Sequence, residues 1–135
     1  MYVYDMDGDL VGKKDLGKMD CGAYDRPEYE WGTASSPIIF KNRVIVQCDT
    51  QKESFIIACD IETGKVLWKT MRDELPSWWT PTIVESEKRM ELVTNASNYI
   101  YGYDSLTGKE FWRLGGSSKI TVPTPPIYCG LLYVL

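Results

Sequence analysis

The side chains that could do chemistry in this chain are acids and thiols, because its 135 residues include no histidine. Ser-His-Asp and Cys-His nucleophile systems and His-ligated zinc are therefore excluded within this segment. The cysteines are widely spaced and form no C-x-x-C pair, which favours buried single thiols over a metal-thiolate site, with a disulfide as the alternative. They are Cys21, Cys48, Cys59 and Cys129.

The acids are the other candidates. Asp5, Asp7 and Asp9 alternate as in a calcium loop, but the full spacing and the distal Glu of an EF-hand are missing. Asp60 and Asp104 stand directly before turns, where a carboxylate accepts hydrogen bonds from backbone N–H groups a few residues on. We therefore expect turn-forming acids, and predict no catalytic, cofactor-binding or metal-binding residue in this segment.

Charge and hydropathy exclude two classes of partner. The formal net charge is −4 and no run of Lys or Arg exceeds two residues, which argues against nucleic-acid binding. No stretch of ~18 apolar residues exists, so we expect no direct membrane insertion. Hydrophobic residues make up 44% of the chain and aromatic residues 13%, which favours a folded chain rich in strands.

Two stretches, 58–68 and 102–112, carry one pattern 44 residues apart: an Asp, a Thr-Gly pair and a Trp four residues after the Gly. Ser36-Pro37, Thr80-Pro81 and Thr124-Pro125 step by the same 44 residues. A repeat of ~40–50 residues built from short strands is typical of a propeller blade. The repeated positions are Ala58, Asp60, Thr63, Gly64 and Trp68 in the first copy. They correspond to Gly102, Asp104, Thr107, Gly108 and Trp112 in the second.

Each of these residues has an expected structural role. Gly64 and Gly108 should supply the positive φ that the turn into the outermost strand requires. Trp68 and Trp112 should fill the gap between adjacent blades, each with its indole N–H bonded to a partner on the neighbouring blade.

Short β-rich runs divide the chain into blades of four antiparallel strands. We expect strands at 37–40, 43–48, 54–60 and 65–70, then at 81–85, 90–94, 99–104 and 109–113. Residues 1–135 thus form one all-β propeller segment: a half blade at 1–14, blades at 36–70 and 80–113, and a half blade at 124–135, with strands near 125–128 and 131–135. The incomplete blades favour a segment of a longer propeller, completed by the remaining blades of its parent chain. The alternative is that the trailing strand pair joins the leading pair of a second copy.

The motif Ala-x-Asp-x-x-Thr-Gly-x-x-x-Trp is intact at 58–68 and altered only at Gly102 in the second copy. It resembles the tryptophan-docking motif of the quinoprotein (PQQ-like) β-propeller family. The resemblance implies propellers of about seven or eight blades. That family includes dehydrogenases that bind pyrroloquinoline quinone (PQQ) with calcium, periplasmic assembly scaffolds, and sensor domains attached to kinases.

Because all these members share the docking motif, it argues for blades and not for quinone. The resemblance also implies that the dehydrogenases often carry a disulfide between adjacent cysteines, which this sequence lacks. Our primary expectation is a non-enzymatic protein-binding or assembly scaffold, exported to the periplasm or the cell exterior, with no cofactor in this segment. The alternatives are a fragment of a PQQ- and calcium-dependent dehydrogenase and an extracytoplasmic sensor domain of a receptor kinase.

A partner-binding surface would lie on the connections between blades, at 15–35, 71–79 and 114–123, opposite the Thr-Gly turns. Aromatic and Arg residues on such loops are typical of protein-binding hot spots. The alternative is that Trp78 and Trp79 cover the blade junction while Arg72 pairs with Asp73 or Glu74. The candidate partner-binding residues are Tyr29, Trp31, Arg72, Trp78 and Trp79, with Tyr24, Arg26 and Lys119 on the same loops.

Overall fold

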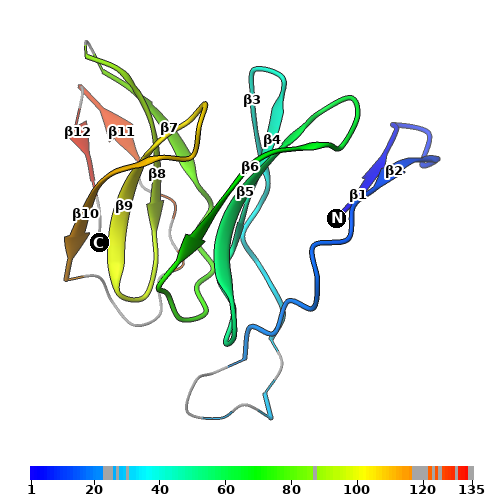
Figure 1. Cartoon of the computed structure of the whole chain (residues 1–135), viewed down its shortest axis with the longest axis horizontal. Helices are drawn as coiled ribbons and strands as arrows, with labels where there is room; N and C mark the ends of the chain where they lie inside the picture. Colours follow the sequence, from blue (N-terminus) through cyan, green and yellow to red (C-terminus); the bar gives the residue numbers. More distant parts are fainter. Residues whose placement is uncertain are drawn as a thin grey trace.

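The computed structural model describes residues 1–22, 26, 28–29, 31–86, 88–116, 122, 124, 126–129 and 131–133. All regular structure in these residues is antiparallel β-sheet, in two four-stranded and two two-stranded sheets (Figure 1). The sheets stand side by side, with the first hairpin at one side of the molecule and the last at the other, and they do not close into a ring. The fold is therefore a set of β-propeller blades, as predicted.

Each four-stranded sheet is a simple meander, because short turns connect strands that are consecutive in the chain. The first has the order β3-β4-β5-β6 and the second the order β7-β8-β9-β10. The strands are β3 (Ile38–Phe40), β4 (Arg43–Cys48), β5 (Ser54–Asp60), β6 (Val66–Arg72), β7 (Thr82–Glu85), β8 (Met90–Asn95), β9 (Tyr99–Asp104) and β10 (Glu110–Gly115).

The two-stranded sheets flank this pair. They are the hairpin of β1 (Tyr2–Tyr4) with β2 (Leu10–Lys13) and the pair of β11 (Ile127–Tyr128) with β12 (Leu131–Leu132). The expected strands of the two blades agree with the structure to within two residues, the largest differences being that β6 and β10 run two residues further. Tyr24, Lys119, Pro125 and residues 134–135 lie outside the described residues.

The two four-stranded sheets pack face to face. One core cluster combines Ile45, Ile56 and Ala58 of the first sheet with Leu92 and Tyr101 of the second. β5 has both of its faces covered: every residue from Ser54 to Cys59 is buried, which agrees with its β-branched and small apolar side chains. Burial of both faces in a central strand follows from a blade that has a neighbour on each side.

Candidate functional site

The first feature of interest is the seam between the two complete blades, where Trp68 lies. Its side chain belongs to the shared core and is only 9% exposed. A Cβ placed on Gly108, at the β9–β10 turn of the next sheet, would stand 2.4 Å from a ring atom of Trp68. The Thr70 hydroxyl donates to the Gly108 carbonyl at 2.7 Å. Strand β6 of one blade thus packs on the β9–β10 turn of the next blade. The contact is so close that only glycine fits at position 108.

The Thr-Gly turns of both complete blades are held by carboxylates. Asp60 Oδ1 accepts hydrogen bonds from the Thr63 backbone N–H at 2.9 Å and from the Thr63 hydroxyl at 2.7 Å. The Thr63 hydroxyl bond, with the backbone bonds, lowers the pKa of Asp60 below its ordinary value. Asp104 Oδ1 accepts from the Leu106 and Thr107 N–H groups at 2.7 and 3.1 Å. These acids are used in turn formation.

The indole N–H groups differ from the expectation. Trp68 Nε1 is buried and has no hydrogen-bond acceptor among the described residues. Trp112 Nε1 donates to Glu91 Oε2 at 2.6 Å, within its own sheet. The predicted hydrogen bonds to a neighbouring blade are therefore wrong. The Trp68 ring lies so closely on backbone that its contacts with the next blade are van der Waals contacts.

A buried charged pair lies at the opposite end of the blades, where the β4–β5 turn meets the β6–β7 connection. Asp49 Oδ1 is 3.4 Å from Arg72 Nε, and both side chains are completely inaccessible. Gln47 Nε2 and Ser77 Oγ donate to Asp49 Oδ2 at 2.8 and 2.5 Å. Burial raises the pKa of Asp49, and the Arg72 charge and these hydrogen bonds oppose the rise. A buried pair with supporting hydrogen bonds fixes the connection to the first blade.

Glu74 continues this connection to the second blade. Its carboxylate accepts from Tyr101 Oη at 2.8 Å and from the backbone N–H groups of Asn98 and Tyr99 at 2.8 and 3.0 Å. The Arg72 guanidinium lies over the Tyr101 ring, 4.7 Å from its centroid. Burial raises the pKa of Glu74, and the hydrogen bonds act against that rise. The residues 72–74 therefore clamp two blades together.

Three of the five candidate partner-binding residues are inside the protein, which corrects their placement on a surface. Arg72, Trp78 and Trp79 are 7%, 8% and 1% exposed. Both indoles are buried, and Arg72 pairs with Asp49 rather than with Asp73 or Glu74. Nothing local marks Asp49 as the partner, because it looks like an ordinary turn acid after a strand.

Tyr29 and Trp31 remain exposed, at 48% and 57%. The Trp31 ring lies 5.6 Å from the ring of buried Trp78, and Trp78 Nε1 donates to the Gly32 carbonyl at 3.0 Å. Arg26 lies over the Tyr29 ring, 5.9 Å from its centroid. We call Arg26, Tyr29 and Trp31 the exposed aromatic surface, and Trp31 is its contact with buried Trp78.

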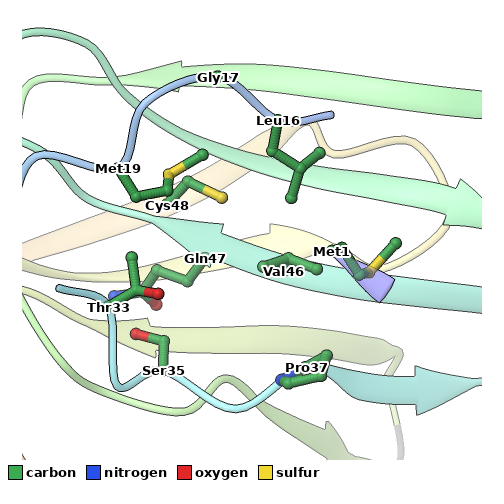
Figure 2. Close-up of a pocket in the computed structure, with 10 residues that line it drawn as sticks. All are labelled: Met1, Leu16, Gly17, Met19, Thr33, Ser35, Pro37, Val46, Gln47 and Cys48. Atoms are coloured by element: carbon green, nitrogen blue, oxygen red, sulfur yellow. The ribbon is translucent and has the colours of Figure 1, made fainter. Parts of the chain in front are cut away.

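A cavity of about 220 Å³ lies between the segment that follows β2 and the first complete sheet (Figure 2). Its wall is mainly apolar and includes Leu16, Met19, Val46 and the Cys48 thiol. Burial raises the pKa of Cys48 to about 12, so this thiol stays protonated and is a poor nucleophile. Among the described residues, no group of three or more Cys, Asp or Glu side chains is arranged to hold a metal ion.

No helix in the described part of the chain could span a membrane. No family model matches the chain, and no curated protein matches it. Among solved structures, the chain is similar to a quinohemoprotein alcohol dehydrogenase from Pseudomonas putida HK5, with a TM-score of 0.57 and 22% identity. The match covers 84% of this chain and 18% of the enzyme, so the chain spans less than a fifth of the enzyme's length. At this identity the likeness shows the propeller fold alone.

Proposed function

We propose that this chain is part of a PQQ-like β-propeller that acts as a non-enzymatic, protein-binding or assembly scaffold outside the cytoplasm. The observation that carries the proposal is the exposed aromatic surface of Arg26, Tyr29 and Trp31, in which Trp31 packs on buried Trp78. Tyrosine, tryptophan and arginine are the side chains that dominate protein-binding hot spots. An aromatic group on a rigid base loses little conformational freedom when a partner binds, which favours affinity.

The acids at the blade junction also support a scaffold. Asp49 is engaged with Arg72, Ser77 and Gln47, and Glu74 with Tyr101 and two backbone N–H groups. A general base needs access to the proton that it removes, whereas these carboxylates are buried and engaged in structural contacts. Their role is to hold adjacent blades in one orientation, and no cofactor is proposed for this segment.

The scaffold role is tested by using the purified chain as bait with an extract of exported proteins. We expect a defined protein to bind, and Trp31→Ala to reduce its retention by about tenfold or more. Leu114→Ala is the matched control, because Leu114 is equally exposed, at 61%, but lies on β10 away from this surface. Equal retention by the wild type and Trp31→Ala would contradict the proposal.

The second candidate is a fragment of a quinone-dependent dehydrogenase, which is favoured by the similarity to a quinohemoprotein alcohol dehydrogenase. The assay is to add PQQ and calcium to the protein, with an alcohol or a sugar and a redox dye. The scaffold proposal expects no substrate-dependent dye reduction. Dye reduction that requires both PQQ and substrate would contradict the scaffold proposal and support the dehydrogenase hypothesis.

A further inference from the structure

Two buried thiols lie where the segment that follows β2 packs on the end of β4. Cys48 is the last residue of β4, and Cys21 belongs to the segment. Both side chains are 1% exposed, and the structure holds both as free thiols. The Cys21 thiol donates at 3.1 Å to the carbonyl of Asp49, the residue directly after Cys48.

The segment contacts this end of β4 at three successive residues. Met19 packs against the apolar cluster that contains Cys48, and Figure 2 shows the two side chains next to each other. The Asp20 carbonyl accepts a hydrogen bond from the Gln51 backbone N–H at 2.9 Å. Together with the Cys21 hydrogen bond, these contacts hold the two thiols at the same buried place.

No other pair of thiols in the described part of the chain is placed to form a bond. Cys59 lies opposite Val44, which is four residues before Cys48 on the same strand. Four residues of a strand span about 13 Å, whereas bridged cysteines have Cα atoms less than about 7 Å apart. Cys129 is exposed and follows β11, in the two-stranded sheet beside the second complete blade (Figure 1).

We propose that Cys21 and Cys48 form a disulfide when the chain folds in the presence of a disulfide oxidant. The inference rests on the proposed place outside the cytoplasm, because disulfides persist in oxidising compartments. To make the bond, the Cys21 thiol gives up its hydrogen bond to Asp49. The structure holds the reduced form, and the titration of these thiols is a property of that form.

The bond forms by two thiol–disulfide exchange steps, which balance with oxidised glutathione as the oxidant. The Cys21 thiolate attacks one sulfur of oxidised glutathione, which gives a mixed disulfide and releases one glutathione thiolate. The Cys48 thiolate then attacks the Cys21 sulfur and releases the second glutathione thiolate. Two cysteine thiols are oxidised to one disulfide, one oxidised glutathione is reduced to two thiols, and these take up the two protons.

The folded chain protects its thiols from this reaction. Burial, followed by the charges of Asp49 and Cys21, raises the pKa of Cys48 to about 12, and burial raises that of Cys21 to about 11. The thiolate that must attack is therefore scarce at neutral pH once the chain has folded. In the unfolded chain both thiols titrate near 9. The bond should thus form during folding, and its test starts from the unfolded chain.

The bond would fasten the loop that carries the exposed aromatic surface. It ties the chain at residue 21, before that surface, and the hydrogen bond from Trp78 Nε1 to the Gly32 carbonyl holds the chain after it. A loop tied at both ends has fewer conformations to lose when a partner binds, so binding has a lower entropic cost.

Peptide mapping by mass spectrometry tests the pairing. The chain is unfolded, refolded in a mixture of reduced and oxidised glutathione, alkylated and digested. We expect the peptide that contains Cys21 to be linked to the peptide that contains Cys48 in most molecules, and Cys59 and Cys129 to be alkylated. Alkylation of both Cys21 and Cys48, or an equally abundant link of either to Cys59, would overturn the proposal.

Thermal unfolding with and without dithiothreitol provides a second test. The oxidised wild type should unfold about 10 °C above the reduced protein, because the bond closes a loop from residue 21 to residue 48. Cys21→Ala should lose this difference. Cys59→Ala removes an equally buried thiol outside the pair and should keep it. A wild type with equal midpoints in both conditions, or a difference that persists in Cys21→Ala, would contradict the assignment.

Neither test uses a binding partner. Failure of the disulfide would therefore leave the bait experiment for the scaffold role unaffected, and failure of the bait experiment would leave the mapped bond in place.

Discussion

At the scale of single residues, the glycine of the repeated Thr-Gly pair has different contacts in the two copies. Gly64 and Gly108 share a positive φ, of +66° and +72°. A Cβ on Gly64 would meet nothing within 4 Å, whereas a Cβ on Gly108 would collide with Trp68. The motif predicts the positive φ of both glycines. Only the packing of two blades shows that Gly108 also contacts the next blade.

This difference predicts unequal costs for two identical substitutions. Gly64→Ala should lower the free energy of unfolding by about 1 kcal/mol through backbone strain alone. Gly108→Ala should lower it by roughly 2–4 kcal/mol, because it adds overpacking against the Trp68 ring to the same strain. Urea denaturation, monitored by tryptophan fluorescence, measures the unfolding free energy of both variants. Equal losses would show that Trp68 does not rest on Gly108.

Truncation of the indole provides the complementary prediction. Trp68→Ala should cost roughly 3–5 kcal/mol of unfolding free energy, because it empties a buried place in the core shared by two blades. Trp31→Ala is the matched control, and should cost about 0.5 kcal/mol because that side chain is largely exposed. A loss of similar size for the two variants would contradict the assignment of Trp68 to the seam.

The buried thiols predict a pH dependence. Burial, with the nearby Asp49 charge, raises the pKa of Cys21 to about 11 and that of Cys48 to about 12. In the unfolded chain these thiols titrate near 9, so above that pH the folded state binds more protons than the unfolded state. Stability should be fully present below pH 9 and should fall as the pH rises toward 11. In urea denaturation at pH 7 and pH 10, Cys48→Ala should show a smaller loss between the two pH values than the wild type. An identical loss would contradict this prediction.

At the scale of elements, the β1–β2 hairpin departs from the other third and fourth strands. Trp68 lies opposite Ala58 and Trp112 opposite Gly102, whereas Gly12 lies opposite Val3. The indole is missing, and a cavity of about 170 Å³ lies between this hairpin and the turn of the first complete blade. The wall includes Val3, Gly12 and Gly64.

Restoring the pattern should therefore stabilise the protein. Val3→Ala with Gly12→Trp gives the hairpin the small residue and the indole that the first complete blade has. We expect a gain of roughly 0.5–2 kcal/mol, which is typical of filling a cavity. Val3→Ala alone is the control, and thermal unfolding is the measurement. No gain over that control would show that the cavity beside Gly64 is not an empty docking site.

At the scale of the whole molecule, the 44-residue period was sufficient to predict the blades, because strands, turns and the docking tryptophans recur in the sequence itself. The burial of Arg72 and Trp79 could not be predicted in this way. Arg72 ends β6, and it finds Asp49 in a turn of its own sheet and Tyr101 in the next sheet, at places that no local pattern marks. The Trp68 N–H likewise has no hydrogen-bond acceptor among the described residues, although the motif predicted one.

The central claim is that the blades are held together by an indole seated on the glycine turn of the next blade. Nuclear Overhauser effects from the Trp68 ring protons to the Gly108 α-protons measure this contact most directly. We predict strong effects at Gly108 and none from any indole to Gly64, which has open space beside it. Trp68 ring protons without an effect to Gly108 would contradict the account.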